Sequence, residues 1–143
     1  MTPEQKTLIR SSWSAIPDAD GFVTSFYTHL FAIDASAARL FAGVDMPAQR
    51  QKVAQTFGVV VRALDDLDSI VPAVVALGAK HAQYGVEHRH FDSVGQALVA
   101  AFADTLGSAF TTDVRDAWVT AYGILSSVMQ QALRNATAGT QPA

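Results

Sequence analysis

Apolar residues recur every three or four positions along most of the chain, which is the spacing that places them on one face of an α-helix. The stretch Thr2-Pro3-Glu4-Gln5 has the form of a helix start: a capping Thr, a Pro at the first helical position and a Gln three residues after the cap. A stripe of apolar residues follows, and Pro17 stops it. We therefore expect a first helix between Thr2 and Pro17.

Five more stripes follow with the same period. Their inward positions are Phe22, Val23, Phe26, Tyr27, Leu30 and Phe31; Gln49, Val53, Phe57, Val60 and Leu64; Val74, Leu77 and His81; Phe91, Val94, Leu98, Phe102 and Leu106; and Val114, Trp118, Tyr122, Leu125 and Met129. We expect Ser69 to cap the helix that carries His81, Gly107 to end the next, and Thr111 or Thr112 to cap the last. The run of valines at 59–61 is typical of a strand, but helical spacing on both sides of it outweighs this signal.

The pattern predicts an all-α protein of six or seven helices, each apolar over a wide face and packed against several neighbours. We assign residues 1–134 to one folded domain. Residues 135–143 are small and polar, with a late Gly and Pro, so we expect a disordered tail there.

Composition excludes several classes of function. The absence of cysteine rules out disulfides, zinc fingers, iron–sulfur clusters and thiol nucleophiles. With a net charge of −3 and Lys and Arg scattered along the sequence, the chain shows no basic run of the kind that binds nucleic acid or a membrane surface. No apolar run approaches the roughly 18–20 residues that span a bilayer, and the start of the chain has no signal-peptide pattern. We expect a cytoplasmic protein.

One histidine lies on an apolar face. His81 follows Leu77 by four positions and Val74 by seven, so it is either a buried residue with a satisfied hydrogen bond or a ligand. His29, His88 and His90 have polar or helix-end neighbours, which favours exposure. His88 and His90 together make only a weak metal pattern, because no third ligand lies nearby.

Two polar residues also occupy inward positions. Tyr27 and Gln49 interrupt stripes that are otherwise apolar, and a buried hydroxyl or amide needs a partner. Either they bond to each other or to the backbone, or both face a cavity in which a polar ligand supplies the partner.

Several separate stretches point to one family. The segments "FYTHLF", "ARLFAG", "LGAKHAQYGV", "FDSVGQALV" and "AWVTAYGILSSVM" resemble the globins, in particular bacterial single-domain haemoglobins and neuroglobin. The resemblance extends from about Thr2 to Ala132. The order of Phe41, then a polar residue at Gln49, then His81 is similar to that of the family.

The resemblance implies a globin fold of six to eight helices around haem b (iron protoporphyrin IX), with His81 as the proximal ligand to iron. A neutral imidazole suits this role, and its other ring nitrogen would donate to the carbonyl of Leu77. The other residues that the resemblance places at the haem are Phe41 on the porphyrin, Tyr27 and Gln49 facing the bound gas, Val53 lining the gas site, Lys52 or Arg50 pairing with a propionate, and Val86, Phe91 and Val94 on the proximal side.

Three departures from relatives refine this expectation. Gln49 stands where neuroglobin has a second iron-binding His, so an open or water-filled sixth position is expected. Phe91 and Leu133 stand where many bacterial relatives have the Tyr and Glu that support the proximal His, which argues against a peroxidase-like role. No glycine-rich turn follows a strand, so we expect neither flavin nor nicotinamide binding in this chain.

Four functional hypotheses follow. The leading one is reversible binding of dioxygen and other small gases, as in oxygen transport. The second is a nitric oxide dioxygenase that detoxifies nitric oxide and needs a separate reductase. A gas sensor would need an output domain, and a haem-free helical sensor would have no use for His81 and Phe41. We expect a monomer or a weak homodimer.

Overall fold

The computed structural model describes residues 1–140. Over these residues the chain forms seven α-helices and two short 3₁₀ segments, with no strand, so the predicted all-α class is confirmed. The elements are α1 (Pro3–Ala15), α2 (Ala19–Ile33), α3 (Ala35–Arg39), α4 (Met46–Arg62), η1 (Leu64–Ile70), α5 (Val71–Gln83), α6 (His88–Leu106), η2 (Gly107–Ala109) and α7 (Thr112–Thr140).

Two of the three predicted helix caps are present. The backbone N–H of Gln5 donates to Thr2 Oγ1 over 3.1 Å, and the backbone N–H of Thr2 donates to Gln5 Oε1 over 3.0 Å, so the capping box is present. Thr111 Oγ1 accepts from Val114 at the start of α7 over 3.3 Å. The prediction for Ser69 is wrong: α5 begins without a side-chain cap, because the Ser69 hydroxyl donates to the carbonyl of Asp66 over 2.7 Å within η1.

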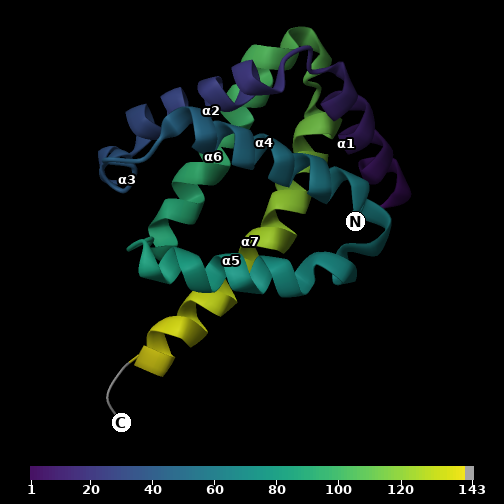
Figure 1. Cartoon of the computed structure of the whole chain (residues 1–143). Helices are drawn as coiled ribbons and strands as arrows, with labels where there is room; N and C mark the ends of the chain where they lie inside the picture. Colours follow the sequence, from purple (N-terminus) through teal and green to yellow (C-terminus); the bar gives the residue numbers. More distant parts are fainter. Residues whose placement is uncertain (141–143) are drawn as a thin grey trace.

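The helices form a cage (Figure 1). α2 packs on α6 and α4, while α1 and α5 both pack on α7. α4 and α5 run across the front of the view, one above the other, and α6 and α7 pass behind them. None of the helices in the described part of the chain is long and apolar enough to cross a membrane.

Stacked aromatic rings fill one end of the cage. The ring centroids of Phe22 and Phe102 lie 4.5 Å apart, and those of Phe102 and Trp118 lie 4.4 Å apart. The indole N–H of Trp118 donates to Ser12 Oγ over 2.8 Å in the buried interior. Aromatic side chains contribute large buried areas, so this cluster fixes α1, α2, α6 and α7 relative to one another.

The last helix is longer than the sequence pattern predicts. α7 continues to Thr140, so the predicted boundary at residue 134 falls inside a helix. The final part of the predicted tail, 141–143, lies outside the described residues.

α5 crosses α7 at a glycine. A Cβ atom on Gly78 would lie 2.5 Å from the backbone oxygen of Met129 and 2.7 Å from Cβ of Ala132. Neither atom can move without shifting α7, so only glycine permits this approach. Gly78 lies one turn before His81 and therefore helps to set where that histidine stands.

Gly78→Ala is expected to lower the free energy of unfolding by about 1–3 kcal/mol, the usual range for overpacking. Gly123→Ala is the matched control in a helix of the same pair, because a Cβ there meets nothing within 4 Å; it should raise stability by about 0.5–1 kcal/mol. Urea unfolding followed by circular dichroism measures both. A Gly78→Ala protein as stable as the Gly123→Ala protein would contradict the close approach.

Candidate functional site

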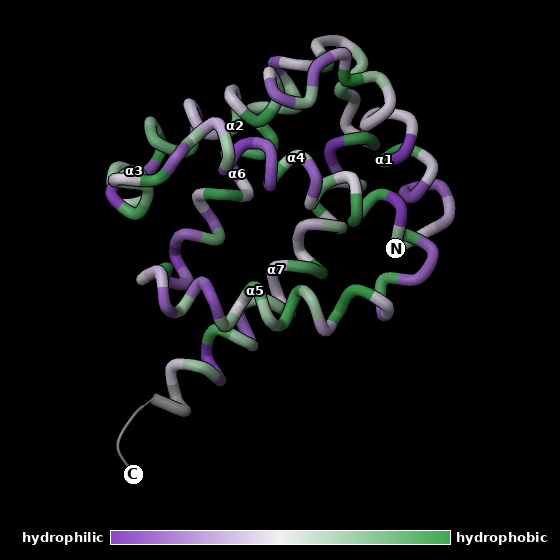
Figure 2. The backbone as a smooth tube through the Cα atoms, in the orientation of Figure 1, coloured by the Kyte–Doolittle hydropathy of each residue, from purple (hydrophilic) through white to green (hydrophobic). Residues whose placement is uncertain are grey.

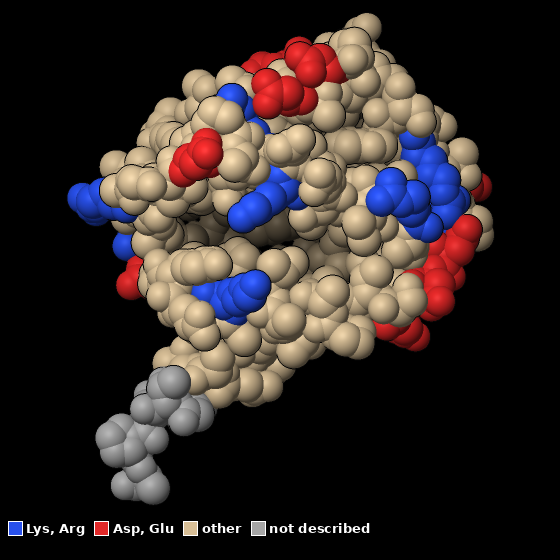
Figure 3. All heavy atoms as spheres, in the orientation of Figure 1, with Lys and Arg blue, Asp and Glu red and all other residues tan. Residues whose placement is uncertain are grey.

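A hollow separates α4 from α5. Figure 3 shows the opening on the face that these two helices border. α4 contains no buried residue although it carries Val53, Phe57 and Val60 on one stripe. α5 is hydrophobic over its first half (Figure 2), yet its inward residue Leu77 is 36% exposed. Phe57 packs against Trp13, with ring centroids 5.5 Å apart, but elsewhere the two helices present apolar side chains that the rest of the protein covers only in part.

His81 stands on the α5 wall with its ring orientation fixed. Its Nδ1 lies 2.5 Å from the carbonyl oxygen of Leu77. A carbonyl only accepts, so Nδ1 carries the hydrogen and Nε2 keeps its lone pair. No partner for Nε2 is present among the described residues. An imidazole held in this way is poised to ligate a metal through Nε2.

The segment after His81 folds back beside it. Gly85 has φ +82°, a left-handed conformation that glycine adopts without strain, and the N–H of Val86 then donates to the carbonyl of His81 over 3.0 Å. The ring of Phe91 lies 6.3 Å from the His81 ring. Three of the predicted residues, His81, Val86 and Phe91, are therefore brought together.

Tyr122 fixes the position of Phe91. Its hydroxyl donates to the backbone carbonyl of Phe91 over 2.7 Å, and burial raises the pKa of the Tyr122 phenol well above its usual value. Tyr122 lies on an inward stripe of the last helix, and this position alone gives it no functional role. The sequence does show that Tyr122 places a phenol on an apolar face, where its hydroxyl needs an acceptor. Only the fold shows that the Phe91 carbonyl is this acceptor.

Tyr27 and Gln49 form the polar element on the opposite wall. The amide nitrogen of Gln49 donates to the Tyr27 hydroxyl over 3.2 Å, which is the first of the two interpretations considered above. Burial raises the pKa of Tyr27, while the bond from Gln49 acts in the opposite direction, so the phenol stays protonated. Since its oxygen accepts from Gln49, its own hydrogen stays available to a further acceptor.

Aromatic rings support the Tyr27 phenol. Phe41 lies 5.2 Å from the Tyr27 ring and 5.5 Å from that of Phe31. Phe31 was predicted to point inward but not to belong to the site. Val53 and Val94 are half-buried and pack against the same hydrophobic core.

The two basic candidates differ in their partners. Arg50 Nε lies 3.1 Å from Asp20 Oδ1, so its guanidinium already has a carboxylate. Lys52 is exposed and has no carboxylate within 4 Å. Of these two residues, Lys52 is the one available to an anion at the opening.

The expectation for His90 is wrong. His90 is 5% exposed, because its Nδ1 accepts from the N–H of Glu87 over 2.9 Å and its Nε2 donates to Ser36 Oγ over 2.9 Å. Ser36 also donates to Asp34, and this bond is the main reason that the Asp34 pKa falls to about 2. These contacts join the start of α3 to the start of α6, a link between distant segments that periodicity does not show.

His88 and His90 do not form a metal site. His88 is exposed and its Nδ1 lies 3.2 Å from Gln130 Oε1, whereas His90 points into the interior. In the described part of the chain, no group of three or more His, Cys, Asp or Glu residues is placed to hold a metal ion. Among the predicted site residues, His81 is the one placed to ligate a metal. A single protein ligand is enough when a cofactor supplies the other ligands to the metal.

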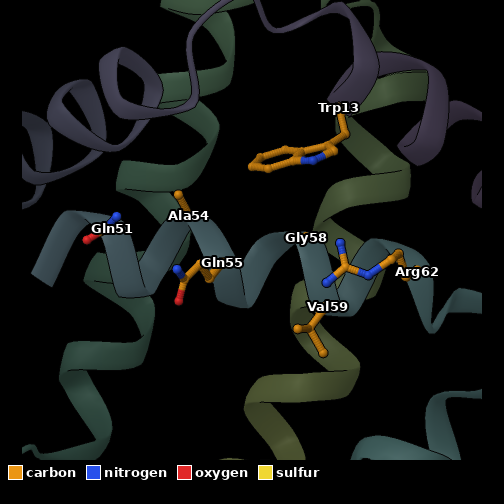
Figure 4. A pocket seen from close by; sticks show the side chains of 7 residues that line it. All are labelled: Trp13, Gln51, Ala54, Gln55, Gly58, Val59 and Arg62. Atoms are coloured by element: carbon orange, nitrogen blue, oxygen red, sulfur yellow. The ribbon is translucent and has the colours of Figure 1, made fainter. Parts of the chain in front are cut away.

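A second depression lies on the other side of α4 (Figure 4). It has a volume of about 530 Å³, and its lining residues are Trp13, Gln51, Ala54, Gln55, Gly58, Val59 and Arg62. None of the residues predicted from sequence lines it, so it is separate from the hollow that contains them.

The residues around the hollow fit a haem. Haem requires apolar walls, one neutral imidazole aimed at iron and cations near its carboxylates. The α4 and α5 stripes, the unpartnered Nε2 of His81 and the free ammonium of Lys52 meet these requirements.

Comparison with known proteins agrees with this fit. A globin family model matches residues 24–129. The flavohemoprotein of Bacillus subtilis is 32% identical over 71% of the chain, which spans 26% of that longer protein. Neuroglobin of Danio rerio is 30% identical, with 90% of each chain covered. A solved structure of a proposed nitric oxide dioxygenase from Rhodothermus marinus, engineered as a carbene transferase, has a TM-score of 0.87 at 22% identity over 97% of both chains. The family match includes Tyr27, Gln49 and His81, and the chain belongs to the globin family.

Proposed function

We propose that this globin holds haem b in the hollow between α4 and α5 and binds dioxygen reversibly. One observation carries the proposal. His81 on α5 has an Nε2 atom without a partner, and Gln49 on α4 is hydrogen-bonded to the Tyr27 hydroxyl on the other wall. Ferrous haem supplies an iron that binds dioxygen and other diatomic gases. We propose that it acts in the cytoplasm as an oxygen-binding monomer or weak homodimer.

Each wall has a separate task. The carbonyl of Leu77 orients the His81 ring and makes its Nε2 a better electron donor. Phe41, Val53 and Phe91 would exclude water from the ring faces. Val86 and Val94 would complete the proximal side, and Lys52 would pair with a propionate at the opening.

The Tyr27 hydroxyl would donate to bound dioxygen. Gln49 donates to the phenol oxygen, which aligns the hydroxyl and leaves its hydrogen free. Dioxygen takes on partial negative charge when it binds ferrous iron, so it is a strong acceptor. Carbon monoxide is much less polar when bound and gains less from the same donor.

His81→Gly should lose most of its haem during purification, and added imidazole should partly restore it. The cavity left by the side chain admits the free ligand, which tests ligation rather than folding. His88→Gly is the matched control, since His88 is exposed and bonds only to Gln130; it should keep its haem. Absorption spectra of the purified proteins measure the outcome. A normal Soret band in His81→Gly without imidazole would mean that another residue is the ligand.

Tyr27→Phe should accelerate dioxygen release by roughly ten- to a hundredfold. A hydrogen bond to a strongly polarised acceptor contributes about 1.5–3 kcal/mol, and each 1.4 kcal/mol is about tenfold in an equilibrium constant. Carbon monoxide release should change much less. Tyr84→Phe, at a residue that is 61% exposed, is the control and should leave both rates unchanged. Stopped-flow ligand replacement measures both gases, and equal acceleration of both would show that Tyr27 gates access instead.

Nitric oxide dioxygenation is the second candidate. The first support is the similarity of 71% of this chain to a flavohemoprotein. The second is the Tyr27–Gln49 pair, whose donors would hold dioxygen. Val53 is a small residue and would leave room for nitric oxide. Nitric oxide, dioxygen and one electron give nitrate. The electron comes from the ferrous state, so a separate reductase must restore that state after each turnover.

Mixing the dioxygen-loaded protein with nitric oxide should give one equivalent of nitrate and then stop with ferric haem. Stopped-flow absorption and nitrate analysis measure this single turnover. Slow or absent nitrate formation would exclude the dioxygenase and leave reversible oxygen binding. Sustained turnover with NADH alone would instead reveal a reductase function within this chain.

A further inference from the structure

The positive charge of the chain is concentrated on the helices beside the hollow. α3, α4 and α5 contain no Asp or Glu, and they carry five of the ten Lys and Arg residues. Because the net charge of the whole chain is −3, the remainder carries a net charge of −8. The globin is therefore acidic overall but basic on one set of neighbouring helices.

Most of these cations have no carboxylate partner. The Lys and Arg residues with a carboxylate within 4 Å are Lys6, Arg10, Arg50, Arg89 and Arg115. The other five are exposed, and all but Arg134 lie on the three helices beside the hollow: Arg39, Lys52, Arg62 and Lys80. Because no internal ion pair compensates these charges, they can attract an anionic group that approaches from solvent.

Two of these cations lie on the walls of the opening. Figure 3 shows Lys or Arg side chains both above and below the hollow, and Asp and Glu at the top, on the left and at the lower right of this face. Lys52 belongs to the α4 wall and Lys80 to the α5 wall. Arg62 instead lines the depression on the other side of α4. A haem would bring two propionates, fewer than the three remaining unpaired cations, Arg39, Lys52 and Lys80, so at least one cation stays uncompensated when the site is filled.

We propose that the basic rim of the hollow, formed by Arg39, Lys52 and Lys80, docks an acidic protein that donates single electrons to the haem. This inference rests on the proposed function. In the transfer the donor is oxidised by one electron and ferric iron is reduced to ferrous, with no atom exchanged. The hollow is where an edge of the cofactor would come nearest to the surface, so a donor held over it has the shortest path.

Electrostatics also selects the orientation. Complementary charge steers association and raises its rate, within a Debye length of about 10 Å at 0.1 M salt. An acidic donor is attracted to the rim and repelled by the remainder of the chain, which carries a net charge of −8. Productive docking would thus not require a large apolar contact, as suits a partner that must leave after each electron.

Binding of a purified bacterial flavodoxin, an acidic one-electron carrier, tests the proposal. Titration calorimetry with the haem-loaded ferric globin should give a dissociation constant that rises at least tenfold between about 10 and 300 mM salt. Lys80→Glu and, independently, Arg39→Glu should weaken binding at low salt by about threefold or more. Arg134→Glu makes the same change of charge at an exposed cation on α7 and should have an effect below about twofold.

Stopped-flow reduction by flavodoxin semiquinone or hydroquinone should follow the same order of variants. Absent binding at low salt, binding that does not depend on salt, or equal losses in Arg134→Glu and Lys80→Glu would each overturn the docking site. The haem spectrum and dioxygen binding are measured first on every variant, so loss of the proposed gas-binding function is distinguished from loss of docking.

Discussion

The close approach of α5 to α7 at Gly78 is the constraint on which the site depends. With the backbone of α7 close to where a Cβ of Gly78 would stand, α5 is held tightly against α7. His81 lies on α5 one turn further on, where the Leu77 carbonyl sets its ring. The missing side chain at Gly78 thus helps to set how far the imidazole stands from α7.

The remainder of the cage differs in character from this wall. α1, α2, α6 and α7 are joined by packed aromatic rings and by hydrogen bonds such as Trp118–Ser12, which is buried, and Tyr122–Phe91, which is partly buried. α4 has no buried residue. One side of the cage is therefore rigid, and the apolar helices on the other side are incompletely covered. This arrangement suits a large flat ligand, because the bound ligand would complete the core.

Charge adds a second level of organisation to the same hollow. The helices that form its walls and its left-hand edge carry cations without acids, whereas the acids lie on the other helices, in η1 and in the connecting segments. Apolar walls favour the cofactor, and the basic rim favours its carboxylates and then an acidic partner. One set of helices would therefore serve both binding of the haem and its reduction.

The sequence by itself determined the helical class and the ends of several helices, because period, caps and glycines are local signals. Periodicity could place His81, Tyr27 and Gln49 inward, but not decide what each touches. Only the tertiary structure paired Gln49 with Tyr27, engaged Arg50 with Asp20 and left Lys52 free. It also buried His90 against Ser36, 54 positions away, where local polarity predicted exposure. Such contacts join segments far apart in the chain, and no local pattern encodes which partner the packing will bring.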